Sequence, residues 1–150
     1  MRLPRVGAIA LLLFSSLAGS ARAQTIVAET EATWMFADGK VVPDNSGYTV
    51  TYEIVGDLVT RTRLVENGTG EVTQDDTIYS VVDDLLSHDL EALAFDPEPC
   101  GDPFACPVIR AVGSPAADAV EILIIGQSFV RSVRSSGDGV ILVEMKRLRD

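Results

Sequence analysis

The chain has 150 residues, with 12 Lys and Arg against 22 Asp and Glu, a formal net charge of −10 at pH 7, and two cysteines. Nucleic acid and anionic membrane surfaces are poor partners for so acidic a chain, because both carry charge of the same sign. The length suits one domain with its own hydrophobic core and is short for two.

The N-terminal 23 residues predict a secretory signal peptide. Two arginines precede an apolar run over residues 6–17, and small residues follow up to an Ala21-Arg22-Ala23 cleavage site. The run is shorter than the roughly 20 apolar residues that span a bilayer, and no later segment reaches that length. We therefore expect cleavage after Ala23 and a single mature domain, residues 24–150, in the bacterial periplasm or the medium, with no transmembrane segment. Loss of the three arginines of the signal peptide leaves nine basic against 22 acidic residues, a mature net charge of −13.

The first half of the mature chain predicts antiparallel strands. Apolar and polar side chains alternate over residues 26–36 and again over 48–55, which is the period of a half-buried strand. The turn dipeptides Gly56-Asp57 and Asn67-Gly68 then bracket the segment LVTRTRLVE, in which Thr and Arg alternate. Residues 47–74 therefore predict a β-meander.

From Ile78 onward the apolar residues are spaced by three and four, which indicates an amphipathic helix over about residues 78–94. Asp76 or Thr77 would cap its N-terminus, and Asp96-Pro97 would end it. A short strand over 78–82 followed by a shorter helix is the alternative assignment.

Four further strands are predicted in the C-terminal part, over residues 107–112, 119–125, 128–134 and 140–148. About seven or eight antiparallel strands with one inserted helix give a β-rich α+β fold class. A curved sheet that wraps the helix is the first architecture to expect, and a small closed barrel is the second.

Cys100 and Cys106 predict a disulfide, because they are the only cysteines of a chain that carries an export signal. Structural zinc normally takes four nitrogen or sulfur ligands, and two Cys with one His fall short of that number. A redox pair is usually C-x-x-C at a helix N-terminus, unlike the spacing here. No metal site is expected.

The proline-rich segment around these cysteines is a candidate partner-binding loop. A stiff loop loses little entropy on binding, and Phe104 at its tip could be an anchor, flanked by Asp102 and Glu98. The alternative, which we favour, is a structural staple with Phe104 packed against the core.

Acidic residues are concentrated between positions 64 and 109, where eleven acids occur without a single Lys or Arg. This stretch could dock a cationic partner or bind calcium weakly. A solvated face that keeps an exported protein in solution is the simpler explanation, since charge runs are ordinarily solvated.

No catalytic constellation is recognisable. His88 is the only histidine, and on the predicted helix it faces solvent. The pairs Asp75/Asp76 and Asp83/Asp84 could serve a carboxylate-based hydrolase, although helix capping explains them more simply. The sequence has no G-x-S-x-G, H-E-x-x-H, P-loop or dinucleotide-binding glycine motif, so no cofactor is implied.

Four aromatic residues fall on inward-facing positions of neighbouring predicted strands, namely Trp34, Phe36, Tyr48 and Tyr52. They could line a pocket for an apolar ligand, or they could fill the core. The leading hypothesis is therefore an exported, non-enzymatic domain that binds a protein or an envelope component. A carrier of a small apolar ligand is the second hypothesis, and a carboxylate-based hydrolase is a distant third.

Overall fold

The computed structural model describes residues 23–44, 48–66, 68–82, 93–98, 100–101 and 106–149. It contains nine β-strands: β1 (Ala23–Ala37), β2 (Lys40–Asp44), β3 (Thr49–Val55), β4 (Leu58–Glu66), β5 (Val72–Val81), β6 (Val108–Ala116), β7 (Ala119–Gly126), β8 (Phe129–Ser136) and β9 (Gly139–Arg147).

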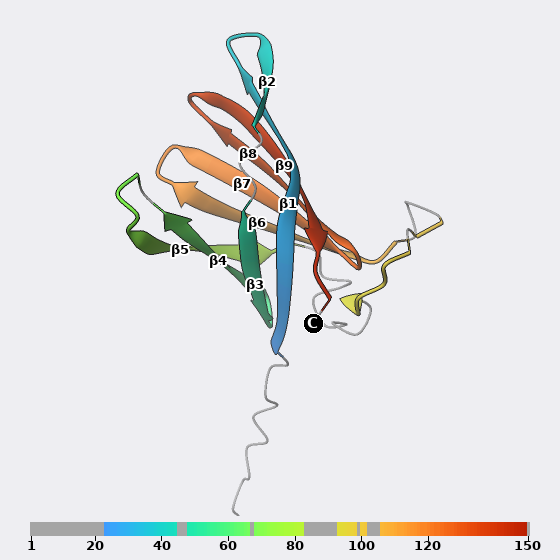
Figure 1. Cartoon of the computed structure of the whole chain (residues 1–150). Coiled ribbons are helices and arrows are strands. Elements are labelled where there is room, and N and C mark those ends of the chain that lie inside the picture. The colour runs from blue at the N-terminus through green and yellow to red at the C-terminus, as the bar shows by residue number, and fades with distance from the viewer. Residues whose placement is uncertain are drawn as a thin grey trace, which may run out of the picture.

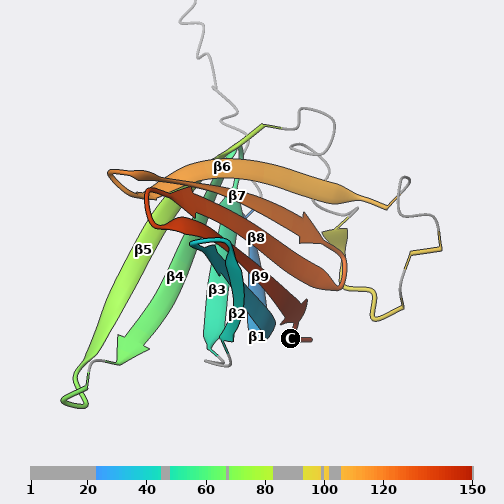
Figure 2. The same ribbon diagram turned by 90° about the horizontal axis from the view of Figure 1, so that it is seen from above.

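The strands form one antiparallel sheet that closes on itself, as Figures 1 and 2 show. Closure comes from β1, whose residues 28–36 pair with β9. The other edge of β1 is shared, because residues 23–29 pair with β3 and residues 33–37 pair with β2. Eight of the strands thus form a closed barrel, and β2 extends it at one end. A closed barrel is the second of the two architectures that the sequence predicted.

The predicted helix over residues 78–94 is wrong for its first turn, because residues 78–81 belong to β5. Tyr79 is fully buried and Ile78 is 63 % exposed, so successive side chains alternate between the two faces of the sheet, as in a strand. The apolar residues from Ile78 onward have a helix-like spacing in the sequence because Ile78 is apolar although its side chain faces outward. Residues 83–92 lie outside the described residues, and no α-helix occurs in the described ones.

A β-bulge in β1 reverses which side chains face the barrel interior. Thr30 pairs with Met145 but Ala32 pairs with Glu144, so one extra residue is inserted between these pairs. Such an insertion shifts the inward positions from even to odd residue numbers. Thr33 is accordingly buried in the second half of the strand.

At one end of the barrel, which we call the plugged end, Leu93 and Phe95 from the described part of the β5–β6 connection lie against the interior. Leu93 in that connection is fully buried. The Arg147 guanidinium lies beneath it and donates hydrogen bonds from Nη1 to the carbonyl oxygens of Leu93 (2.7 Å) and Gly126 (2.8 Å). The ring of Phe95 lies 5.8 Å from the Arg147 Cζ atom. The fold itself therefore supplies two acceptors to Nη1 of this guanidinium.

The opposite end, which we call the mouth, carries the turns of the β1–β2, β6–β7 and β8–β9 hairpins. Between the two ends the interior is apolar, with a core that includes Ile26, Val50, Tyr52, Ile54, Val59, Ile109, Leu123, Ile125, Val130, Val143 and Met145. Approaching the mouth, the inward positions of β4, β5, β7 and β8 change from apolar to charged and polar side chains.

Candidate functional site: the mouth of the barrel

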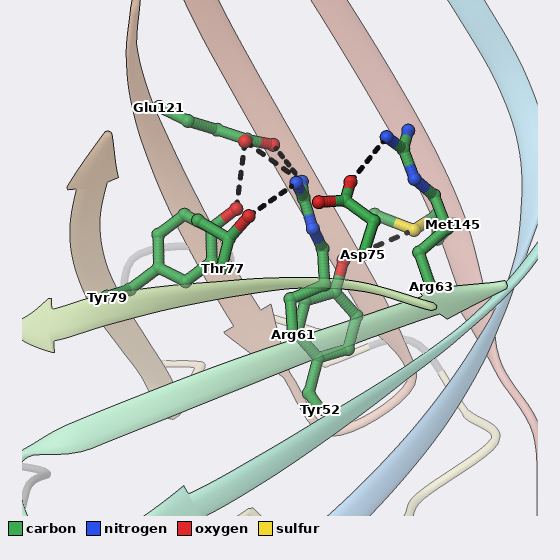
Figure 3. A network of polar contacts seen from close by, with 8 residues as sticks. All are labelled: Tyr52, Arg61, Arg63, Asp75, Thr77, Tyr79, Glu121 and Met145. Atoms are coloured by element: carbon green, nitrogen blue, oxygen red, sulfur yellow. Dashed lines mark hydrogen bonds and ion pairs between the residues drawn. The ribbon is translucent and has the colours of Figure 1, made fainter. Parts of the chain in front are cut away.

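A buried ion pair spans the barrel just below the mouth. Arg61 on β4 donates from Nη1 to both carboxylate oxygens of Glu121 on β7, at 3.0 and 2.9 Å. Its Nη2 donates to the Thr77 hydroxyl at 3.0 Å. The side chains of the ion pair are only 9 % and 4 % exposed, so the attraction is weakly screened by water. Figure 3 shows these contacts reaching across the interior.

Tyr79 on β5 completes this network, because its hydroxyl donates to Glu121 Oε2 at 2.8 Å. Tyr79 pairs with Gly113 on β6, and Gly113 pairs with Glu121. A Cβ atom at position 113 would lie 2.6 Å from Tyr79 Cδ1. Only glycine at this position therefore allows the tyrosine ring to lie over β6 and reach the carboxylate.

The network holds its tyrosine protonated and its arginine charged. Burial, followed by the negative charge of Glu121, raises the pKa of Tyr79 far above its usual value. Burial is the largest single influence and lowers the pKa of Arg61, but Glu121, Tyr79, Tyr52 and Asp75 together more than offset it and leave the pKa above its ordinary value. From neutral pH to about pH 10, the tyrosine and the arginine of this site therefore both keep their protons.

A second ion pair lies closer to solvent. Arg63 Nη2 on β4 donates to Asp75 Oδ2 on β5 at 2.6 Å, with side chains 31 % and 40 % exposed. The Arg63 Cζ atom lies 5.8 Å from the centre of the Tyr48 ring, within the range of a cation–π contact. Both carboxylates of this region are thus held by arginines, which adds no support to the carboxylate-based hydrolase.

A cavity of about 310 Å³ opens beside this network, on the β8–β9 side of the mouth. Its walls are formed by Met35, Arg134, Ser136, Asp138, Gly139 and Ile141. Arg134 lies directly opposite Glu121 in the β7–β8 register. Its Nε atom is buried and has no hydrogen-bond partner. Arg134 also makes no ion pair with any residue that the structure describes.

The four aromatic residues predicted to share a pocket are divided between the two faces of the sheet. Tyr52 is buried in the core, where its hydroxyl donates to the Met145 sulfur at 3.5 Å, and Tyr48 packs against the core. Phe36 is 41 % exposed, and Trp34 shares its face of β1. The bulge between Thr30 and Ala32 explains this division, because it turns Met35 toward the cavity and turns Trp34 and Phe36 to the outer face.

The predicted disulfide fits the structure, in which the Cys100 and Cys106 sulfurs are bonded and their Cα atoms lie 5.7 Å apart. A second hollow of about 220 Å³ lies beside it, lined by Glu98, Cys100, Cys106, Pro107, Gln127, Ser128 and Phe129. Glu98 is exposed, and its backbone N–H donates to Asp96 Oδ1 at 3.0 Å. Phe104, Asp102 and His88 lie outside the described residues.

Sequence reasoning missed Arg61, Glu121 and Arg134, although the chain carried a signal for the first two. Arg61 has the same strand phase as the core residue Val59, and Glu121 interrupts the apolar run of β7. Charged residues on buried strand positions need partners of opposite sign. Strand phase alone therefore favours an ion pair between these two residues of opposite charge.

Comparisons with known proteins identify no relative: no family model, no curated protein and no solved structure matches this chain. Within the described residues, no group of three or more His, Cys, Asp or Glu side chains could hold a metal ion. The part of the chain that the structure describes has no helix long and apolar enough to cross a membrane.

Proposed function

We propose that this chain is an exported, non-enzymatic binding module that holds a small, largely apolar ligand at the mouth of its barrel. The observation that carries the proposal is the cavity of about 310 Å³ between Met35, Arg134 and Ile141. Binding pockets for small molecules typically measure about 300–1,000 Å³, with mostly apolar walls and a few polar groups. This cavity is at the lower end of that range, so it suits a small ligand or one end of a longer chain.

The barrel centre is less suitable than the mouth. Tyr52, Leu123, Val130 and Met145 pack there as one buried cluster, with Tyr52 bonded to Met145. Protein cores of this kind are packed as densely as organic crystals, and opening one to a ligand would break these contacts. The carrier hypothesis therefore moves from the aromatic pocket predicted around Tyr52 to the cavity beside Met35.

Export is supported by the signal-like N-terminal sequence and by the disulfide between Cys100 and Cys106. Disulfides of this kind persist in the periplasm and outside the cell and are rare in the cytosol. Both observations are compatible with a protein that meets its ligand in the cell envelope or the medium.

The proposal is tested with N-phenyl-1-naphthylamine, a neutral apolar dye whose fluorescence rises in apolar surroundings. We expect saturable fluorescence enhancement with the mature protein. Met35→Trp should abolish most of it by filling the cavity, whereas Val120→Trp, on the exposed outer face of β7, should leave it unchanged. No enhancement, or equal loss in both variants, would contradict binding at the mouth.

The protein-partner hypothesis has one observation in its favour, the hollow beside the disulfide. Phe129 and Pro107 supply apolar walls there, and Glu98 supplies a negative rim. Such a hollow could receive a side chain from an envelope protein. Cross-linking in intact cells should then yield an adduct that disappears with Phe129→Ala. An adduct of unchanged yield would remove the hollow from consideration.

A further inference from the structure

Arg134 is an inward-facing arginine of the mouth that has no ion-pair partner among the residues that the structure describes. The inward-facing arginines of this region are Arg61, Arg63 and Arg134, and its ion-paired carboxylates are Glu121 and Asp75. Two arginines are matched to these two carboxylates, which leaves a positive charge at the cavity wall. That charge stands out in a chain whose formal net charge is −10.

Glu121 lies beside Arg134 in the sheet but is not available to it. Oε1 of Glu121 accepts a hydrogen bond from Arg61. Oε2 accepts hydrogen bonds from Arg61 and from the Tyr79 hydroxyl. Both carboxylate oxygens are therefore engaged by Arg61 and Tyr79, which are themselves buried. Arg134 is left facing the cavity with its Nε–H donor buried and unsatisfied.

The Nε atoms of Arg61, Arg63 and Arg147 are also buried without a partner, but those three guanidinium groups form hydrogen bonds through Nη. No hydrogen bond joins Arg134 to any residue that the structure describes, and a half-buried guanidinium in that position calls for an acceptor. A guanidinium binds a carboxylate best through two parallel N–H···O bonds, for which Nε and one Nη can serve as the pair of donors. At Arg134 the donor that lacks a partner is one member of such a pair. Met35 and Ile141 stand beside it, so the cavity combines one anion-binding group with apolar walls.

Asp138 is the only acidic residue in the cavity lining, and it lies exposed on the β8–β9 turn. An anionic head group should therefore avoid the rim and settle at Arg134, deeper along β8. The apolar part of the ligand then lies against Met35 and Ile141. Because Asp138 is exposed, its repulsion of an approaching anion is partly screened by salt.

From this geometry we propose that the ligand of the mouth is an amphiphilic anion, an acyl chain that ends in a carboxylate, and that Arg134 binds the carboxylate. This inference rests on the function proposed above, because it names the chemical class of ligand for the same cavity.

The test compares three ligands of equal chain length, decanoate, decan-1-ol and decylamine, by equilibrium dialysis of radiolabelled compound at about 0.15 M salt. The mature protein should bind decanoate at least tenfold more tightly than decan-1-ol, and decylamine most weakly. Arg134→Gln should reduce the preference for decanoate over decan-1-ol to less than twofold, and Arg134→Lys should leave an intermediate value. Asp138→Asn should strengthen decanoate binding by a few-fold.

Arg131→Gln is the matched control on the same strand, because Arg131 is exposed and already paired with Glu144 at 2.8 Å. Its preference for decanoate should equal that of the unchanged protein. Circular dichroism and thermal unfolding establish that each variant is folded. If Arg134→Gln does not fold, Arg134→Lys takes its place in the comparison with the unchanged protein.

The possible failures are distinguishable. Equal binding of decanoate and decan-1-ol, unchanged in both Arg134 variants, would overturn the carboxylate inference while leaving a ligand site at the mouth. A preference for decylamine would overturn it also. If none of the three compounds binds and the neutral dye does not bind either, both the inference and the proposed function fail.

Discussion

Each end of the barrel places an arginine at its interior, and the two arginines are treated differently. At the plugged end, Arg147 is 5 % exposed and donates to the carbonyl oxygens of Leu93 and Gly126. At the mouth, Arg134 faces a cavity and makes no hydrogen bond or ion pair with any residue that the structure describes. The first guanidinium is held by backbone carbonyl groups of the chain itself, whereas no described residue provides an acceptor for the second. The difference identifies the mouth as the end where binding should be sought.

The two ends also differ in the charged groups that they bury. The plugged end needs a single cation held by carbonyl groups, whereas the mouth is built around a buried ion pair. An ion pair of that kind contributes little net stability compared with apolar residues of the same size, but it becomes very costly when one partner is removed. The mouth is therefore the end at which single substitutions should do the most harm.

The largest expected effect comes from breaking the pair between Arg61 and Glu121. Arg61→Met alone or Glu121→Leu alone should lower the free energy of unfolding by about 3–5 kcal/mol, because each leaves a buried charge without its partner. The double variant should recover most of that loss. Urea unfolding of all four proteins measures the effect. Additive losses in the double variant would contradict the account.

Gly113→Ala should be the next most damaging change. A methyl group there would lie 2.6 Å from Tyr79 Cδ1 and 2.7 Å from the Ile78 carbonyl oxygen. Overpacking of this kind typically costs about 1–3 kcal/mol. The control is Gly68→Ala, where a Cβ meets nothing within 4 Å and the change should stay within about 0.5 kcal/mol. Equal unfolding midpoints for the two variants would show that Tyr79 does not need the space above β6.

Stability should fall in alkaline solution because of the mouth and core tyrosines. Burial raises the pKa of Tyr52 and of Tyr79 above the unfolded value of 10.0. Above pH 10 the unfolded chain releases these protons while the folded chain keeps them. The free energy of unfolding is therefore unaffected by them below pH 10 and falls as pH rises beyond it, by about 1.4 kcal/mol per pH unit for each tyrosine.

Tyr79→Phe isolates the mouth's share of that slope. The variant should be less stable at neutral pH, because Glu121 loses a hydrogen bond, but its decline above pH 10 should be shallower by the share of one tyrosine. Urea unfolding at a series of pH values between 9 and 12 is the measurement. A decline as steep as that of the unchanged protein would mean that Tyr79 titrates normally.

The smallest effect should come from the ion pair on the outer surface. Arg131 and Glu144 meet at 2.8 Å with side chains 48 % and 38 % exposed. Exposed pairs contribute about 0–1 kcal/mol, so Glu144→Gln should change the free energy of unfolding by no more than that. A loss as large as that of Glu121→Leu would remove the distinction between buried and exposed pairs on which the comparison depends.

Much of the meander was predictable, because its turns are coded locally. Gly56-Asp57 separates β3 from β4, as the sequence indicated, and the predicted strands over 128–134 and 140–148 correspond to β8 and β9. Strand phase in β3 also followed directly from alternation, with Tyr52 and Ile54 buried.

Long-range features could not be read in the same way. The closure of β1 on β9 depends on residues more than 100 positions apart, which no local pattern encodes. The bulge after Thr30 has no glycine to mark it, and it reverses the inward face for Met35 and its neighbours. For this reason the predicted aromatic group was divided, and the cavity residues Met35 and Arg134 were not anticipated. At Ile78, an apolar side chain on the outer face imitated a helical period.

Methyl NMR of the methionines gives the most direct test of the claim that the mouth, and not the core, binds the ligand. Met35 lines the cavity, and Met145 lies 3 % exposed in the core beneath it. With [¹³C-methyl]methionine in the mature protein, titration of decanoate should shift the Met35 signal in a saturable way and leave Met145 in place. A shift of Met145 alone, or of neither signal at saturating decanoate, would contradict the account.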